Sequence, residues 1–238
     1  MSITDNIRRI VDELNNEVSL AGRKEGSVQL CAVSKTKSIE KVREALNAGV
    51  NLKHIGENYV QEIMTKYPIE YKSSREFTLH MIGHLQTNKV KHIVPYVDTI
   101  DSIDSLKVLD KVNEAALEIG KQIEILIELN TAHDGYKTGF MSDDEALRAL
   151  DGIEEKKGVI LKGFMTMGQL DGSESEVRAS FAHLREFSER AKKEHPSIIM
   201  NELSMGMSAD WKYAIKEGST MVRIGTAIFG EREYNLVL

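Results

Sequence analysis

The sequence predicts an α/β fold, a single (β/α)8 barrel with one extra helix at its N-terminus. Short apolar segments of strand length alternate with helical patterns about eight times after a leading helix. The chain has 238 residues, close to the roughly 250 that such a barrel uses. Apolar strands that alternate with helices are typical of a parallel sheet covered by helices, either doubly wound or closed. The number of units favours the closed barrel.

The first element is an amphipathic helix over residues 4–22. Apolar residues recur there at helical spacing, beginning with Ile7 and Ile10 and ending with Leu20, a period typical of a helix with one buried face. Thr4 or Asp5 is placed to accept hydrogen bonds from the first N–H groups. We therefore expect one helix before the barrel units.

Eight strand–helix units are expected after this helix, with no linker that would divide residues 1–238 into domains. The expected strands are 28–34, 52–56, 77–83, 97–101, 122–130, 159–165, 198–205 and 220–225. The expected helices are 39–48, 58–66, 87–94, 104–118, 142–151, 174–194, 209–217 and one from about 226. The longer loops at 131–141 and 167–174 follow strands, which places them on the face where barrels build active sites.

Composition excludes several classes of protein. With 37 acidic and 31 basic side chains the formal net charge is −6, so we expect neither nucleic acid nor an anionic membrane as a partner. No stretch approaches the roughly 20 uncharged residues of a spanning helix. Cys31 is the single cysteine, which excludes an intrachain disulfide and suits a reducing, cytoplasmic location.

Familiar catalytic signatures are missing from the sequence. It contains no G-x-G-x-x-G, no G-x-x-x-x-G-K-[ST] and no H-E-x-x-H, the motifs of dinucleotide, nucleotide and zinc-protease sites. The seven histidines are dispersed. His80 and His84 straddle the end of an expected strand, so we interpret them as structural and expect no metal site.

The first expected strand ends in a lysine. In Val28-Gln-Leu-Cys-Ala-Val-Ser-Lys35, alternation places Cys31, Val33 and Lys35 on one face and aims the amine into the barrel mouth. An amine in a partly desolvated site loses its proton more readily and then attacks aldehydes. Lys35 is therefore a candidate for Schiff-base chemistry. The alternative is a lysine that starts a solvated loop beside Lys37.

Two glycine-containing turns follow the last two expected strands. Ser208 lies in the first turn, and Gly225 and Thr226 lie in the second. Glycine lets a phosphate approach the backbone, N–H groups at a helix start point toward it, and a hydroxyl adds a donor. Barrels commonly bind phosphate after strands 7 and 8. The alternative is that Ser208 and Thr226 only cap helices.

Five segments carry the motifs of a known family. They are Ala32-Val-Ser-Lys35-Thr-Lys37, Gly56-Glu-Asn58-Tyr59-Val-Gln-Glu62, Ile82-Gly-His84-Leu-Gln86-Thr-Asn88-Lys89, Leu203-Ser-Met-Gly-Met-Ser208-Ala-Asp210 and Val222-Arg223-Ile-Gly225-Thr226-Ala-Ile-Phe-Gly230. In order and spacing they closely resemble the YggS/PROSC family, the pyridoxal phosphate homeostasis proteins. The resemblance covers essentially the whole chain. It implies a TIM barrel similar to the N-terminal domain of alanine racemase, without that enzyme's second, β-rich domain.

The resemblance also implies a role for each cofactor-binding residue. Lys35 would form the internal aldimine with pyridoxal 5'-phosphate (PLP), and Arg223 would face the pyridine nitrogen. Asn58 would contact the ring or its 3-hydroxyl. The phosphate would be held by Ser208, Gly225 and Thr226. Met205 and Met207 would line the pocket, with core packing as the alternative. Lys137 in the loop 131–141 is an alternative amine or loop contact, or a solvated charge.

The family implies a carrier rather than an enzyme of robust turnover. Such a protein would buffer PLP, support PLP and amino-acid homeostasis, and contact PLP-dependent apoenzymes transiently, as a cytoplasmic monomer. An arginine beside the ring nitrogen disfavours its protonation and so weakens the ring as an electron sink. The alternatives are an amino-acid racemase or lyase of low activity, and an interaction module that reports the vitamin state to a partner.

Overall fold

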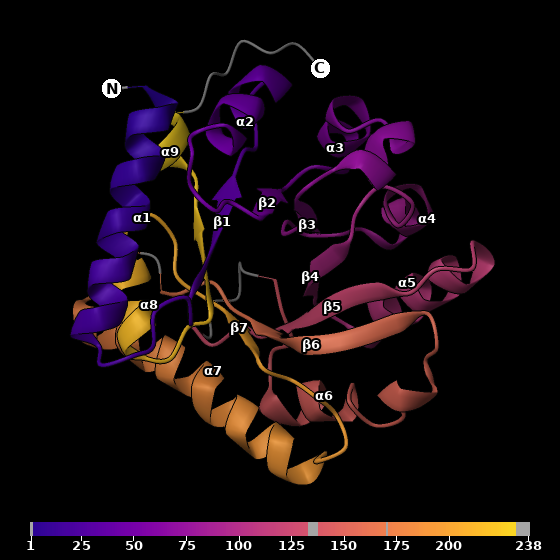
Figure 1. Cartoon of the computed structure of the whole chain (residues 1–238). Coiled ribbons are helices and arrows are strands. Elements are labelled where there is room, and N and C mark those ends of the chain that lie inside the picture. Colours follow the sequence, from indigo (N-terminus) through magenta and orange to yellow (C-terminus); the bar gives the residue numbers. More distant parts are fainter. Residues whose placement is uncertain (1, 133–137, 170, 232–238) are drawn as a thin grey trace.

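Eight parallel strands pair in the order of the sequence and close into a barrel, because β8 also pairs with β1. This computed structural model describes residues 2–132, 138–169 and 171–231. Helices surround the strands on all sides (Figure 1). The predicted fold, a (β/α)8 barrel with an added N-terminal helix, is confirmed.

The strands are short and lie close to their predicted positions. They are β1 Gln29–Val33, β2 His54–Glu57, β3 Thr78–Met81, β4 Thr99–Ile103, β5 Ile123–Glu128, β6 Val159–Met165, β7 Glu202–Ser204 and β8 Met221–Ile224. The prediction for β7 began at residue 198 and was too long. Ile198 instead closes a turn onto the carbonyl of His195, and Ile199 is 75% exposed. An apolar pair in a turn was therefore mistaken for strand sequence.

The helices follow the strands as expected. They are α1 Ile3–Leu20, α2 Ile39–Leu46, α3 Val60–Lys66, α4 Val90–Ile93, α5 Leu106–Glu118, α6 Asp143–Arg148, α7 Glu174–Glu194, α8 Trp211–Lys216 and α9 Thr226–Phe229. Three short 3-10 helices, η1 Ile69–Ser74, η2 Thr87–Lys89 and η3 Ile153–Glu155, join them. The first of these, directly after Pro68, and the third were not predicted, whereas the second lies within the helix expected over 87–94.

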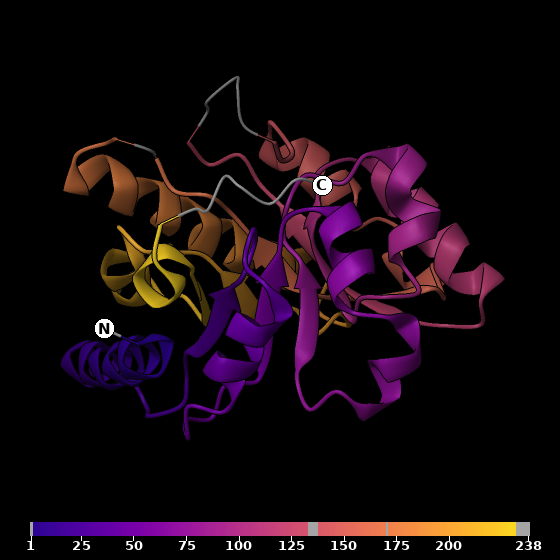
Figure 2. The same cartoon turned by 90° about the horizontal axis from the view of Figure 1, so that it is seen from above.

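Helix α1 begins earlier than its pattern suggested. Ser2 is its N-cap, and Ser2 and Asp5 form a reciprocal capping box, in which the side chain of each accepts from the backbone N–H of the other. The expectation that Thr4 or Asp5 is the cap was therefore wrong, because the serine lies one turn earlier. The helix packs on α2, α8 and α9. In Figure 2 it lies beside the yellow C-terminal segment, away from the magenta helices.

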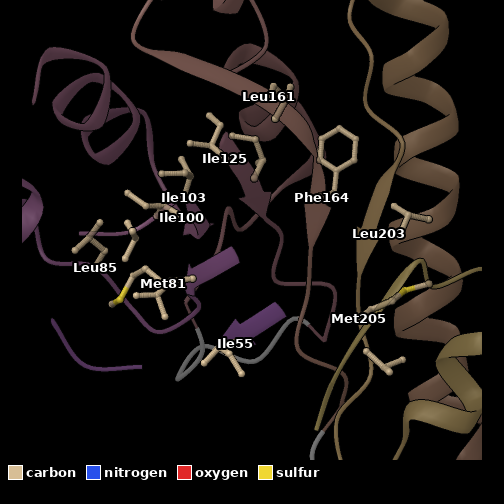
Figure 3. Packing of buried hydrophobic residues seen from close by; sticks show 14 of the residues in the cluster. Ile55, Met81, Leu85, Ile100, Ile103, Ile125, Leu161, Phe164, Leu203 and Met205 are labelled. Atoms are coloured by element: carbon tan, nitrogen blue, oxygen red, sulfur yellow. The ribbon is translucent and has the colours of Figure 1, made fainter. Parts of the chain in front are cut away.

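Strand residues divide between the core around the barrel and the barrel lumen. The main hydrophobic cluster contains Ile125 and Ile127 of β5, and Figure 3 shows Ile125 close to Leu161 and Ile103. Strand alternation places Leu126 and Glu128, which are buried outside that cluster, on the opposite, lumenal face. The lumen therefore holds several polar side chains at the level where barrel ligands bind.

No helix within the described ranges combines the length and the apolar character needed to cross a bilayer.

Candidate functional site

The two glycine turns predicted to bind an anion lie side by side. Ser208 follows β7 and Gly225 follows β8, and the backbone N–H of Gly225 donates to Ser208 Oγ over 3.4 Å. Thr226 is exposed and begins α9, whose first N–H groups have no carbonyl partner within the helix. One hydroxyl and several backbone donors therefore gather at this point of the barrel mouth.

Gly225 also joins these turns to the first strand. A Cβ atom at residue 225 would lie 3.1 Å from the carbonyl oxygen of Val33 and 3.4 Å from its Cβ. Val33 is the last residue of β1, two positions before Lys35. The glycine therefore lets this turn pack closely against the strand that leads to the lysine, and a side chain at residue 225 would crowd Val33.

Lys35 lies just beyond β1, in a tight turn closed by a hydrogen bond from the Lys37 N–H to the Ser34 carbonyl. The next residue, Thr36, has a φ of 63°. A β-branched residue rarely adopts this left-handed conformation, and such strained residues cost roughly 1–3 kcal/mol and cluster at functional sites. The turn therefore requires contacts that hold it in place.

Helix α3 supplies those contacts. The Thr36 N–H donates to Glu62 Oε1 over 2.6 Å, and Lys66 Nζ donates to the Ser34 carbonyl over 2.8 Å. Glu62 and Lys66 pair with each other at 2.8 Å, with both side chains close to fully enclosed. The ion pair thus holds the backbone of this turn on both sides of Lys35, at Ser34 and at Thr36.

Glu57, at the end of β2, completes the network behind the turn. Its Oε1 accepts from Ser34 Oγ at 2.6 Å, Lys66 Nζ at 2.7 Å and Tyr67 Oη at 2.9 Å. Burial raises the pKa of Glu57, while Lys66 opposes the rise. Glu57 and Glu62 were part of the motif found in the sequence, but no role was predicted for either. The bonds of Glu62 to Thr36 and of Glu57 to Ser34 depend on tertiary contact and could not be predicted from spacing.

The two lysines of this turn differ in their surroundings. Lys37 is 3% exposed, and its Nζ donates to the carbonyl of Glu231, just after α9. Lys35 is half-buried. Lys37 is therefore enclosed and joins the first and last units, and the greater exposure of Lys35 favours it as the reactive amine. Lys137 lies outside the described residues.

Arg223 lies in the lumen beside the same turns. It is 4% exposed, and Nη1 donates to the carbonyl and hydroxyl of Ser204 at 2.6 and 2.8 Å. Nη2 donates to the Thr166 carbonyl at 2.8 Å. Burial lowers the pKa of this guanidinium. These bonds fix its plane, and its position facing a pyridine nitrogen stays a prediction.

Asn58 and Met205 complete the predicted set. Asn58 follows β2, and its Oδ1 is buried without a hydrogen-bond partner in the described chain. A buried polar atom of this kind is costly unless a ligand or water satisfies it. Met205 is fully buried in the main hydrophobic cluster near Leu203 (Figure 3). A contact between Met205 and a cofactor stays a prediction.

A second cluster of polar side chains, formed by His54, His80 and Asp101, was not predicted from the sequence. His80 Nδ1 lies 3.0 Å from Asp101 Oδ2, and His80 Nε2 lies 2.9 Å from His54 Nδ1. Burial is the largest single influence and lowers the pKa of His80, but the charge and hydrogen bond of Asp101, together with the charges of Glu202 and Asp98, raise it on balance. Burial and the neighbouring His80 lower the pKa of His54 to about 4. The histidines were interpreted as structural, yet nothing in the sequence indicated the pairing.

A cleft of about 560 Å³ opens on the other side of the mouth. The turns after β3, β4 and β5 form it, and His84, Asn88, Asp104 and Thr138 are among its lining residues. His84 Nδ1 lies 2.8 Å from Asp104 Oδ2. None of the residues predicted to hold the cofactor lines this cleft.

Comparison with known proteins agrees with this arrangement. Residues 5–233 match the family model described as alanine racemase, N-terminal domain. The chain is 35% identical over 237 residues to a pyridoxal phosphate homeostasis protein of Pasteurella multocida, covering 99% of this chain and 100% of that protein. A protein of the same name from Vibrio cholerae is 36% identical over 236 residues, with 98% of each chain covered.

The chain belongs to the family of pyridoxal phosphate homeostasis proteins. A solved member of similar fold is PipY of Synechococcus elongatus, whose structure was determined with PLP bound. It has 31% identity to this chain and a TM-score of 0.81, and the match covers 96% of this chain and 100% of PipY. Family membership confirms the resemblance from the five motifs, while the role of each site residue stays a prediction.

Proposed function

We propose that this chain binds PLP, holds it covalently on Lys35 and acts as a carrier and buffer that maintains PLP and amino-acid homeostasis. One observation carries the proposal. The Gly225 N–H bonds to Ser208 of the neighbouring turn, and Gly225 packs so close to the strand that leads to Lys35 that a Cβ at residue 225 would lie 3.1 Å from the Val33 carbonyl oxygen. An amine and an anion-binding turn therefore lie at the same mouth, as an aldehyde with a phosphate tail requires.

The residues present fit the cofactor. The Gly225 N–H and the Ser208 hydroxyl lie within hydrogen-bond distance of each other, so both donors are placed to face one phosphate. Thr226 begins the adjoining helix. The partnerless Oδ1 of Asn58 offers a polar contact for the ring substituents. When bound, PLP supplies an aldehyde that amines attack and a ring that withdraws electrons.

The protein groups favour holding over turnover. The Glu62–Lys66 pair fixes the backbone around Lys35, so the amine is presented in one place. Arg223 is held by Ser204 and Thr166, and a guanidinium beside the ring nitrogen disfavours a proton there. Without that proton the ring is a weaker electron sink. We therefore propose a cofactor carrier without robust catalysis, located in the cytoplasm as a monomer and contacting apoenzymes transiently.

The covalent link is tested by mixing the purified chain with PLP. An absorption band of a protein-bound imine is expected, and borohydride reduction with peptide mapping should place the label on Lys35. Lys35→Ala should lose the band, and the exposed control Lys24→Ala should keep it. A label on Lys37 or Lys137 in the wild-type chain contradicts the assignment.

Carrier and enzyme are separated by a second experiment. The loaded chain is incubated with alanine or serine in deuterated water, and deuterium at Cα is measured. A carrier gives exchange no faster than free PLP at the same concentration. Exchange well above that rate, abolished by Lys35→Ala, identifies a racemase or related enzyme instead.

A further inference from the structure

Glu128 is a buried carboxyl that the proposed cofactor site does not use. It ends β5 and is 1% exposed. Its Oε1 accepts a 2.7 Å hydrogen bond from Thr138 Oγ1, and its Oε2 is buried without a partner among the described residues. Alternation with Ile127, which lies in the core cluster, places the side chain of Glu128 on the lumenal face.

The carboxyl lies behind the wall of the cleft of about 560 Å³. Its hydrogen-bond donor, Thr138, is part of the cleft wall. Asp104 and His84, which also line the cleft, act on its charge, as does Arg223 from the lumen. Charged groups in both the cleft and the lumen therefore act on Glu128.

The cleft and Lys35 lie on different sides of one mouth. In a closed barrel of eight sequentially paired strands, β5 lies opposite β1. Glu128 ends β5, and Lys35 follows β1. A ligand with its anionic tail at Ser208 and its aldehyde carbon on Lys35 would leave the β3–β5 side of the mouth open. The cleft formed by the turns after β3, β4 and β5 therefore lies across the mouth from Lys35.

The side chains around the cleft determine which class of ligand it can bind. Among the lining residues Asp104 is an acid, and Gln86 and Asn88 offer amide oxygens. The acid Glu128 lies directly behind the lining residue Thr138, to which it is hydrogen-bonded. A primary ammonium carries three N–H donors and no acceptor, which matches such acceptors and would satisfy the partnerless oxygen of Glu128. We propose that this cleft is the entry site for an alkylamine, whose ammonium is bound by Glu128 and Asp104 and loses a proton to Glu128. The inference rests on the proposed covalent attachment of PLP to Lys35.

The step exchanges one carbon–nitrogen linkage and moves two protons from the incoming nitrogen to Nζ. Glu128 takes the first proton from R–NH3+, and the neutral amine nitrogen bonds to the carbon held by Lys35 Nζ. A second proton then passes from the newly bonded nitrogen to Nζ, and the linkage between the carbon and Nζ breaks with its electrons returning to Nζ. The proton on Glu128 finally passes to the released amine of Lys35, which leaves the carboxylate as it began. Atoms and charge balance without an oxidant or reductant.

The surroundings tune Glu128 for this exchange. Burial raises its pKa to about 7, and the Asp104 charge adds to the rise. The hydrogen bond from Thr138 and the charges of Arg223 and His84 act in the opposite direction. A base is most effective when its pKa lies near the working pH. The carboxyl can therefore both accept and return a proton near neutrality.

Kinetics of cofactor transfer test the role directly. The PLP-loaded chain is mixed with Nα-acetyl-L-lysine amide, and the amine-dependent rate of PLP transfer is followed by absorbance and mass spectrometry. Glu128→Gln should lower the second-order rate constant at least tenfold and leave release without amine unchanged. The matched control is Glu124→Gln, at the other end of β5, where the side chain is 44% exposed. An unchanged amine-dependent rate in Glu128→Gln overturns the proposal.

A binding measurement on the wild-type chain without PLP does not depend on the folding of any variant. The carboxyl carbon of Glu128 is titrated by 13C NMR with and without the lysine probe. A bound ammonium should lower the midpoint by at least one pH unit, and an unmoved midpoint with both lysine probe and L-alanine overturns the proposal. A shift with the lysine probe alone identifies a lysine side chain as the source, and a shift with alanine identifies free amino acids.

The two proposals fail in different ways. If the wild-type chain never carries PLP on Lys35, the proposed function is wrong. If loading is normal but exchange with amines is independent of Glu128, only this inference is wrong.

Discussion

The backbone N–H of Thr36 donates a 2.6 Å hydrogen bond to the carboxylate of Glu62. This bond joins the residue of strained conformation directly after Lys35 to helix α3. Lys66 pairs with the same carboxylate oxygen and also donates to the Ser34 carbonyl. The position of Lys35 therefore depends on an ion pair between two other residues, Glu62 and Lys66.

Glu62→Ala should weaken PLP binding without removing the reactive amine. Loss of a hydrogen bond to a charged group costs about 1.5–3 kcal/mol, and each 1.4 kcal/mol is about tenfold in affinity. We expect the Kd for PLP to rise about tenfold or more in an absorbance titration, with the label still on Lys35. Glu62→Gln keeps an acceptor oxygen for the Thr36 N–H and should lose less affinity for PLP than Glu62→Ala.

The control for this change is the adjacent α3 residue Gln61, which is exposed. Gln61→Ala should bind PLP as the wild type does. Equal affinity of Glu62→Ala and wild type would show that the turn holds its shape without the carboxylate.

Ser208→Ala should lower affinity for the phosphate part of PLP while leaving the fold intact. Ser208 is exposed and bonds only weakly to Gly225, at 3.4 Å. One hydrogen bond contributes about 0.5–1.5 kcal/mol net, so we expect a roughly threefold to tenfold rise in Kd for PLP. Affinity for pyridoxal, which lacks the phosphate, should not change. The exposed Ser19→Ala is the control, and an equal loss of affinity for both ligands would place the serine elsewhere.

Sequence pattern predicted the barrel because each strand carries its own local signal. Cys31 and Val33 alternate with Leu30 and Ala32, and the structure has the second pair in the core cluster and the first pair outside it. Boundaries were less accurate where tertiary contacts decide them. Ile199 is apolar yet 75% exposed in a turn, and no local pattern distinguishes it from a strand residue.

The site was predictable where a motif is contiguous and not where distant segments meet. The turns holding Ser208 and Gly225 were found from glycine and hydroxyl residues after strands. The contact of Glu62 with Thr36 joins residues 26 apart, and Glu128 became notable only because folding buries it. Apolar spacing predicts which faces are buried, but it does not show that a particular carboxyl such as Glu128 is enclosed, and burial is what changes the pKa of that group.

Asp101→Asn should be strongly destabilising. Asp101 is fully buried and bonds to His80 Nδ1 at 3.0 Å and Thr99 Oγ1 at 2.8 Å. Removing one partner of a buried ion pair costs about 3–5 kcal/mol, measurable by denaturant unfolding. The pKa of His80 should also fall, because burial then acts without the opposing charge of Asp101. His80→Gln in the same chain should recover part of the loss. A variant as stable as wild type would show that His80 is neutral in the fold.

Glu128→Gln should change how stability depends on pH. Burial raises the pKa of Glu128 from 4.5 to about 7 in the folded chain, so between these values the folded state keeps a proton that the unfolded state has lost. Stability from this group is complete below pH 4.5 and is lost as pH rises toward 7. The wild type should lose up to about 3 kcal/mol over this range relative to Glu128→Gln.

Denaturant unfolding of both chains at several pH values measures this difference. The glutamine keeps the shape and the acceptor for Thr138, yet cannot ionise, so the stability of Glu128→Gln minus that of wild type should grow with pH. Glu124→Gln, on the same strand, controls for the loss of one acidic residue. A difference that stays constant from pH 4.5 to 7 would mean that water reaches the carboxyl and that Glu128 ionises as readily in the folded chain as in the unfolded one.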